Sequence, residues 1–252
     1  MGCDFADQLA IQSWCFRTYE THDKVIEALK ACDVRCVELT TRHVFAGGKS
    51  YPGGPQALVD FYLERGITIS GYGLHVFSEG TEADARWLME LARAAGFGSL
   101  AADFKPGGVE QAERLAAEYG VKVALHNHGR RHRYGPAWAI EEVLSATSPN
   151  IGLCLDTAWA IDSGDDPVAL ARKHADRLYG VHVKDFVFDR AGKPEDIIVG
   201  TGNLDLPTFL GTLKEIGFAG AFTLEYEGDV ENPIPATKQC VQAIRKAAKA
   251  LR

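Results

Sequence analysis

The chain alternates between two hydrophobic periods from one end to the other. Short runs rich in apolar residues are typical of strands, and the segments between them carry apolar residues at helical spacing. The strand-like runs are residues 9–17, 36–40, 67–75, 99–103, 121–126, 151–156, 178–184 and 222–225. The first and last runs end at positions 17 and 225, which lie 208 residues apart. Seven steps over this distance average about 30 residues, the size of a strand–helix repeat. Eight such repeats are what a closed (β/α)₈ barrel requires.

The segments between the runs carry helix signals. Predicted helices cover residues 21–32, 55–65, 81–95, 112–119, 136–145, 206–216 and 235–251. Thr81 and Asp84 have the spacing of a capping box, and Gly96 ends the same helix. Asp166 before Pro167 indicates the start of a further helix. Strands that alternate with helices predict parallel pairing through right-handed crossovers.

The length of the chain leaves two architectures to compare. At 252 residues, one α/β barrel and two smaller domains are both compatible with the size of a hydrophobic core. No linker rich in Pro, Ser and Gly divides the chain, and no GxGxxG or phosphate-binding loop follows any strand, as a doubly wound nucleotide-binding sheet would need. We therefore predict an α/β fold, a single (β/α)₈ TIM barrel domain over residues 1–252.

Charge and composition exclude several kinds of partner. The formal charge of −7 argues against nucleic-acid binding, and no apolar run reaches the roughly 20 residues that span a bilayer. The start of the chain, MGCDFADQLA, lacks the basic region of a signal peptide. The six cysteines contain no CxxC pair, which favours reduced thiols. We expect a cytoplasmic protein that acts on a small molecule, with no nucleic-acid or membrane partner.

Ionisable residues gather where the predicted strands end. In a barrel of this kind, chemistry takes place at the carboxyl ends of the strands and in the loops that follow. The residues at these positions are Arg17, Glu38, His75, Asp103, His126, Asn127, His128, Asp156, His182, Lys184, Asp185, Glu225 and Glu227. Four of the eight histidines are among them. Because buried ionisable groups cost free energy unless they are paired, this clustering indicates a site.

The specific hypothesis is one divalent metal ion. Asp156, His182 and Glu225 come from three successive strand ends, and two carboxylates with an imidazole suit Mn²⁺, Mg²⁺, Co²⁺ or Zn²⁺. His126 is the expected fourth ligand, with His128 as its competitor, because residues two apart on a strand share a face.

Each of these residues also has an ordinary structural role open to it. Asp156 could cap the following turn, Glu225 could pair with Lys184, and His182 could be a satisfied core histidine. The run RRHR at 130–133 could bind an anionic substrate group or be a solvated basic loop.

These motifs together resemble one enzyme family. The sequence is similar to the sugar phosphate isomerase/epimerase family of xylose isomerase-like barrels, which includes tagatose epimerases, hydroxypyruvate isomerase and inosose dehydratase. The segments that carry the resemblance are CFR (15–17), VEL (37–39), GYGLHVFS (71–78), ALHNHG (124–129), LCLDT (153–157), VHVKDF (181–186), VGTGNLD (199–205) and LEYEG (224–228).

The resemblance implies a metal held by one residue from each of strands five to eight, usually Glu, Asp, His and Glu. Asp156, His182 and Glu225 match this pattern, whereas His126 stands where relatives carry Glu. The epimerases use that glutamate as one of two bases on opposite substrate faces, so their two-glutamate mechanism does not carry over. Many relatives also have a substrate-binding His where this chain has Trp159. The HNH of strand five resembles a subgroup with neighbours that act on oxidised sugars by elimination.

The implied chemistry is proton abstraction next to a carbonyl, with the metal, Mn²⁺ as first choice, as Lewis acid for the enediolate. The candidate bases, in order, are His128, Glu38 and Glu225, and the Lys184 ammonium is expected near the developing oxyanion. The expected substrate contacts are His75, Trp159, Asn127 and Arg17.

Three functions compete. The first is a metal-dependent sugar isomerase or epimerase, and the second is a lyase or dehydratase that eliminates a β-leaving group from a keto-sugar or 3-keto-glycoside. The third is a non-catalytic sugar-binding barrel. Apurinic-site nucleases share the architecture, but the net charge of −7 argues against a phosphate-binding surface. The resemblance is also compatible with a homodimer.

Overall fold

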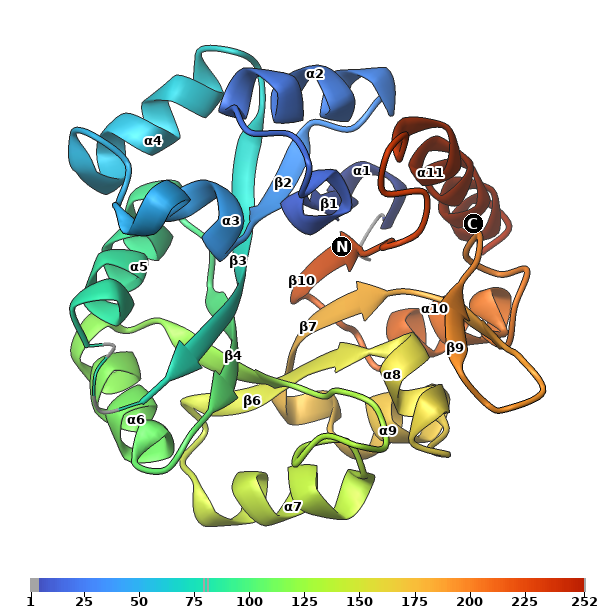
Figure 1. The fold of residues 1–252 in the computed structure, drawn as a ribbon. Helices are drawn as coiled ribbons and strands as arrows, with labels where there is room; N and C mark the ends of the chain where they lie inside the picture. The colour runs from blue at the N-terminus through green and yellow to red at the C-terminus, as the bar shows by residue number, and fades with distance from the viewer. Residues whose placement is uncertain (1–4, 79, 81, 252) are drawn as a thin grey trace.

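Eight parallel strands close into a barrel with helices around it (Figure 1). The computed structural model describes residues 5–78, 80 and 82–251. Going round the barrel, the strand order is β1-β10-β7-β6-β5-β4-β3-β2, and every neighbouring pair is parallel. The barrel strands are β1 Ala10–Gln12, β2 Cys36–Leu39, β3 Thr68–Phe77, β4 Ser99–Phe104, β5 Lys122–His126, β6 Ile151–Asp156, β7 Leu178–Val183 and β10 Ala221–Leu224. The predicted (β/α)₈ barrel is confirmed.

A main helix follows each barrel strand. These helices are α2 His22–Ala31, α4 Gly54–Leu63, α5 Glu82–Ala95, α6 Gly108–Tyr119, α7 Ala137–Ala146, α9 Pro167–Lys173, α10 Leu206–Glu215 and α11 Ile234–Lys249. Asp166 accepts a hydrogen bond from the Val168 amide at the start of α9, as the sequence predicted. Thr81, the first residue of the expected capping box, lies outside the described residues. None of the described helices combines the length and the apolar character needed to cross a membrane.

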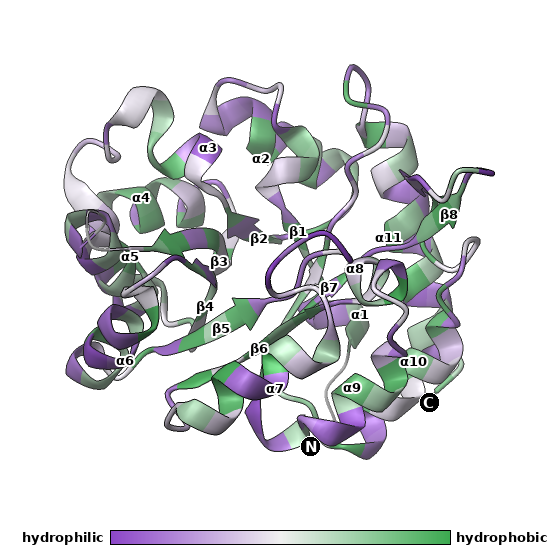
Figure 2. Cartoon of the chain, turned by 60° about the horizontal axis from the view of Figure 1, so that its bottom comes forward, coloured by the Kyte–Doolittle hydropathy of each residue, from purple (hydrophilic) through white to green (hydrophobic). Residues whose placement is uncertain are grey.

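The large apolar core lies between the strands and the helices. In Figure 2, β5 and β6 are coloured mostly as hydrophobic, while α5 and α6 carry many hydrophilic residues. Helix α5, for example, buries Ala85, Leu88, Met89, Leu91 and Ala92. Small side chains form a second, smaller cluster, which consists of Ala101, Ala124 and Cys154. These small residues leave room inside the barrel for polar groups.

Short elements depart from the predicted pattern near the carboxyl ends of the strands. Strand β1 ends at Gln12, and a 3₁₀ helix, η1 Ser13–Phe16, replaces the expected continuation to Arg17. An antiparallel hairpin of β8 and β9 follows β7, where only a loop was expected. The remaining short elements are α1 Phe5–Gln8, α3 Thr41–Val44, η2 Ala46–Gly48, α8 Thr157–Asp162, η3 Ala175–Arg177, β8 Phe186–Phe188 and β9 Pro194–Asp196. Several of these elements form the walls of the site.

Candidate metal centre and active site

Four side chains from neighbouring strands converge at the carboxyl end of the barrel. His126 ends β5, Asp156 ends β6, His182 lies in β7 and Glu225 directly follows β10. One ligand atom from each lies within 4.8 Å of the others, and all four residues are buried. The register explains the convergence, because Asp156 pairs with His182 across β6 and β7. The structure therefore brings together the four residues that the sequence analysis selected as metal ligands.

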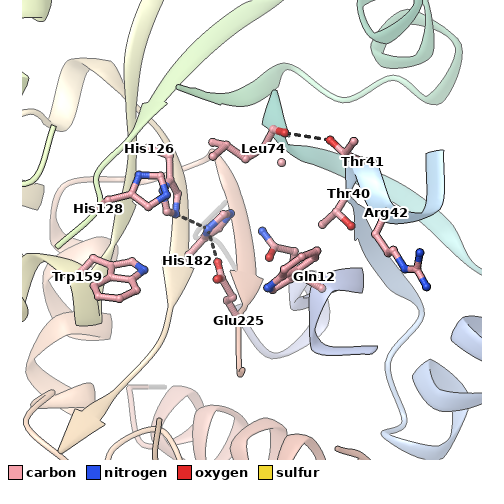
Figure 3. Close-up of a pocket in the computed structure, with 12 residues that line it drawn as sticks. Gln12, Thr40, Thr41, Arg42, Leu74, His126, His128, Trp159, His182 and Glu225 are labelled. Carbon is pink, nitrogen blue, oxygen red and sulfur yellow. Dashed lines mark hydrogen bonds and ion pairs between the residues drawn. The ribbon is translucent and has the colours of Figure 1, made fainter. Parts of the chain in front are cut away.

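The hydrogen bonds of His182 leave one ring nitrogen facing the centre of this cluster. Its Nε2 lies 2.8 Å from Glu38 Oε1, so the neutral imidazole would donate to Glu38 and keep a lone pair on Nδ1. That Nδ1 lies 2.9 Å from Glu225 Oε2 and 2.9 Å from His126 Nε2 (Figure 3). Burial alone would lower the pKa of His182, but Cys154, Glu38 and Glu225 outweigh it and hold the pKa well above its usual value. The acidic neighbours of His182 therefore favour positive charge at this point of the site.

Asp156 combines the capping role with a free ligand atom. Its Oδ1 accepts a hydrogen bond of 2.8 Å from the Trp159 amide at the start of α8. Its Oδ2 is buried, has no hydrogen-bond partner among the described residues, and lies 3.7 Å from His126 Nε2. Burial raises the pKa of Asp156 above its usual value. An unpartnered carboxylate oxygen that faces an imidazole nitrogen can serve as a metal ligand.

These observations test whether the cluster fits a divalent cation. Two imidazole nitrogens and two carboxylate oxygens are a donor set that Zn²⁺, Mn²⁺ and Co²⁺ accept. The orphaned Oδ2 of Asp156 and the Nδ1 of His182 both face the shared centre. The residues present fit a divalent metal ion, and the donor set does not select among these metals.

Lys184 directly follows β7 and bonds to Glu225 of this cluster. It is 1% exposed, and its Nζ lies 3.0 Å from Glu225 Oε1 and also bonds Glu227 Oε1. Asp196 Oδ1 lies 4.0 Å from the same nitrogen. Burial opposes the charge, but these carboxylates outweigh it and keep the pKa of Lys184 well above its usual value. Burial would likewise raise the pKa of Glu225, but Lys184 and His182 hold it well below its usual value.

Glu38 lies buried inside the barrel and contacts the cluster through His182. It is 2% exposed, and its carboxylate accepts hydrogen bonds from Gln12 Nε2 at 2.8 Å and from Thr223 Oγ1 at 3.0 Å, besides its contact with His182. A Cβ atom at Gly73 would lie 2.6 Å from Glu38 Oε1, so that glycine makes room for the carboxylate. This geometry favours a role in orienting His182 over the expected role as a base.

A pocket of about 290 Å³ opens above the cluster. His126, His182, Glu225, His128 and Trp159 form one wall. The opposite wall is formed by Gln12, Trp14, Thr40, Thr41, Arg42, Gly73 and Leu74 (Figure 3). The volume is just below the usual range for ligand pockets, about 300–1,000 Å³. The sequence analysis missed the opposite wall because it selected ionisable residues at strand ends, and most of these residues are uncharged. Their positions at or just after the ends of β1 and β2, and within β3 for Gly73 and Leu74, were the available signal.

Of the expected bases and substrate contacts, His128, Glu225 and Trp159 line the pocket. Burial, followed by His132, lowers the pKa of His128, so its imidazole is neutral near pH 7. Its Nδ1 has no hydrogen-bond partner among the described residues. Trp159 lies on α8, and its ring contacts Phe186 with a centroid separation of 4.8 Å. Glu225 belongs to the four-residue cluster and bonds Lys184. His128 is therefore the expected base that lines the pocket and lies outside the cluster.

The other three expected substrate contacts do not line the pocket. Asn127 is 0% exposed, and its amide bonds the backbone of Asp156 through Nδ2 at 3.0 Å and Oδ1 at 2.8 Å. His75 is buried against Phe77, with a ring separation of 4.6 Å. Arg17 donates to the carbonyls of Trp14 and Glu227. In this structure Asn127 braces a candidate ligand, His75 packs in the core, and Arg17 ties two loops together.

Comparison with known proteins places the chain in a family. A family model described as xylose isomerase-like TIM barrel matches residues 107–249. The chain belongs to the xylose isomerase-like TIM barrel family. The predicted family resemblance is therefore confirmed.

Members with curated descriptions are similar over about half of the chain. The rhizopine catabolism protein MocC of Rhizobium meliloti is 33% identical over 140 residues, which is 50% of this chain and 42% of that protein. The inosose dehydratase of Geobacillus thermodenitrificans is 26% identical over 156 residues, 55% of this chain and 52% of the enzyme. The chain spans about half the length of these relatives.

Solved structures match nearly the whole chain. The IolI protein, whose structure holds a zinc atom, aligns with a TM-score of 0.74 and 17% identity over 97% of each chain. A D-tagatose 3-epimerase-like protein aligns with a TM-score of 0.75 and 15% identity, over 97% of this chain and 98% of its own. At these identities the matches establish the shared fold.

Proposed function

We propose that this family member is a metal-dependent lyase that removes the proton next to the carbonyl of a keto-sugar and expels the group β to that carbonyl. One observation carries the proposal. Among the described residues that line the pocket, His128 is the one base outside the candidate metal cluster. A two-base epimerisation needs a second base on the opposite face of the substrate, and the wall from Gln12 to Arg42 offers none. A single base suffices for elimination.

The candidate ligands His126, Asp156, His182 and Glu225 would hold the cation. A divalent ion bound there supplies Lewis-acid polarisation of the substrate carbonyl, which makes the neighbouring proton more acidic. Glu38 keeps His182 in the required tautomer through its bond to Nε2. Lys184 keeps Glu225 ionised. Lys184 does not line the pocket. Its contact with Glu225 therefore supports a role in positioning that ligand rather than direct contact with the oxyanion.

His128 would move the proton. As a neutral imidazole it accepts the proton from the carbon next to the carbonyl while the bond to the β-leaving group breaks and a carbon–carbon double bond forms. The imidazolium then returns that proton to the oxygen of the leaving group. The inosose dehydratases among the relatives support an elimination of this kind.

A sugar isomerase is the second candidate, because a single base can also transfer a proton between adjacent carbons. NMR in D₂O with inosose and with 3-keto-glucose separates the two reactions. Elimination predicts loss of water and an unsaturated product, whereas isomerisation predicts deuterium uptake at conserved mass. We expect exhaustive chelation to abolish turnover and Mn²⁺, Co²⁺ or Zn²⁺ to restore it.

Two variants complete this test. His128→Gln should lower turnover by about 10²–10⁴-fold, the contribution of a positioned base. His174→Gln changes a histidine that directly follows α9, ahead of the start of β7, and that does not line the pocket; it is the matched control. Turnover that survives chelation in a protein without metal by elemental analysis would contradict the proposal. A protein that binds sugars and turns none of them over would support the non-catalytic alternative.

A further inference from the structure

A second cavity adjoins the pocket above the metal cluster. It has a volume of about 640 Å³ and shares His128 and Trp159 with that pocket. Its other walls come from the loop after β5, from α8 and from the tip of the β8–β9 hairpin. The shared residues place the candidate base at the junction of the two spaces. A ligand that fills both would have its middle beside His128.

Arg130 ties the walls of this second cavity together. Its side chain donates to Asp162 Oδ1 from Nε at 3.1 Å and from Nη2 at 2.7 Å, and its amide donates to Asp162 Oδ2 at 2.9 Å. Nη2 also donates to the carbonyl of Gly192 on the hairpin at 2.6 Å. The first arginine of the RRHR run is thus committed to the protein itself. Its Nε and Nη2 groups are therefore engaged within the protein, and Nη1 is the remaining donor group.

Ionisable side chains, among them His132 and Asp162, line part of this cavity, and the remaining walls offer apolar surface for a flat ligand. Trp159, Pro194 and Ala191 offer apolar surface, and Gly129 and Gly192 offer backbone without side chains. Gly129 allows the loop to pack on the indole, since a Cβ there would lie 2.6 Å from the Trp159 ring. Indole and imidazole rings with proline are the surfaces on which planar apolar groups stack. Arg131 and Lys193 lie exposed at the edge of this space.

We infer that the second cavity binds the aglycone of a keto-glycoside, and that an aromatic aglycone fits it better than an alkyl group. This inference rests on the proposed lyase function and names its substrate class. With the keto-sugar ring in the smaller pocket, the glycosidic bond lies beside His128. The proton leaves C2 of a 3-keto ring for His128, the C1–O bond breaks with its electron pair on the aglycone oxygen, and a C1=C2 double bond forms. His128 then returns the proton to that oxygen and releases the aglycone.

Filling the second cavity tests the inference. Ala191→Trp places a bulky ring at the exposed hairpin tip, away from the metal cluster. Glu195→Trp adds the same ring at an exposed position on the same hairpin that does not line the cavity, so it is the matched control. Calorimetry measures the binding of phenyl and methyl β-glucosides, which cannot react because they carry no ketone. Turnover is measured with the corresponding 3-keto-glycosides.

We expect the native chain to bind the phenyl glucoside about tenfold more tightly than the methyl glucoside. Ala191→Trp should remove this preference and lower kcat/KM for the phenyl 3-keto-glycoside about tenfold, with less than twofold change for the methyl compound. Glu195→Trp should change neither. Equal binding of both glucosides, or equal losses on both substrates in Ala191→Trp, would overturn the inference. Phenyl selectivity in binding without turnover of any keto-glycoside would refute the lyase proposal instead.

Discussion

The two halves of the barrel contribute different kinds of side chain to one pocket. Residues 107–249, the part that matches the family model, supply the four candidate ligands, His128 and Trp159. The first half supplies mainly uncharged groups, with Arg42 as the charged residue among the described lining residues. Glu38 is the acid that the first half places under the cluster. The second half of the chain therefore supplies the reactive groups of the pocket, and the first half mainly supplies its shape.

Removing a candidate ligand from the second half should have the largest effect. We expect Asp156→Asn and Glu225→Gln to lower kcat/KM by about 10³-fold or more and to lower the bound metal measured by elemental analysis. The amide keeps the shape of the side chain but removes the anionic ligand. Asp176→Asn, at an exposed position away from the pocket, is the control and should keep both values. Full metal content with full activity in the two ligand variants would remove the functional distinction between the halves.

Glu38→Gln tests whether the first half acts on the metal only through His182. We expect metal affinity to fall about 10–100-fold, because an amide no longer holds the Nε2 proton of His182 as a carboxylate does. Excess metal should then restore most of the turnover. Loss of kcat with unchanged metal affinity would instead support the alternative role of Glu38 as a base. Titration with metal, followed by activity at saturation, separates these outcomes.

His43 provides a contrast, because it is a histidine of the first half with a structural role. Its Nε2 donates to the Tyr19 carbonyl at 3.0 Å, and its Nδ1 lies 3.0 Å from Ser13 Oγ. Burial, with smaller effects of His22 and Arg42, lowers its pKa to about 4. In the unfolded chain His43 is protonated below about pH 6.5, whereas in the folded chain it is protonated only below about pH 4. The free energy of unfolding therefore falls as the pH drops from 6.5 to 4.

His43→Gln keeps a donor and an acceptor without the titration. From pH 7 to pH 5, the native chain should lose about 2 kcal/mol more of its unfolding free energy than this variant, as measured by urea denaturation. Parallel losses in the two proteins would show that His43 is not protonated on unfolding in this range.

Arg42→Gln should have the smallest effect, and on binding. Arg42 lines the wall opposite the metal cluster, and its Nε donates to the carbonyl of Arg17. We expect KM to rise about 3–10-fold while kcat changes less than twofold, because the interaction is equal in the ground and transition states. Steady-state kinetics on the best substrate checks this. A fall in kcat comparable to that of the ligand variants would show that the first half shares the chemistry.

The fold was predictable because periodicity and spacing are properties of the whole chain. Eight repeats of similar length determine a barrel even when single boundaries are wrong, as at Arg17, where a 3₁₀ helix follows β1. The convergence of Asp156, His182 and Glu225 followed from the rule that parallel strands end on one rim. The hairpin of β8 and β9 was not predicted, since its strands have three residues each and little periodicity.

Side-chain roles were less predictable than positions. Asn127 and His75 both lie where strands were predicted to end. Whether such a side chain faces the pocket or packs inside the protein depends on the local backbone and on its partners. The side chain of Asn127 hydrogen-bonds the backbone of Asp156, and the ring of His75 packs on Phe77. The sequence shows that such groups are present, and only three-dimensional neighbours show which of them remain free.

The close approach of Gly73 to Glu38 has an evolutionary consequence. A side chain at position 73 would collide both with the Glu38 carboxylate and with Ala101, whose Cβ would lie 3.0 Å away. Gly71 faces the same carboxylate, at 3.2 Å from a Cβ. Homologues that keep Glu at position 38 should therefore keep glycine at position 73, and lineages that lose one should tolerate loss of the other. Glu38 on β2 and the glycine at position 73 on β3 should therefore be conserved together.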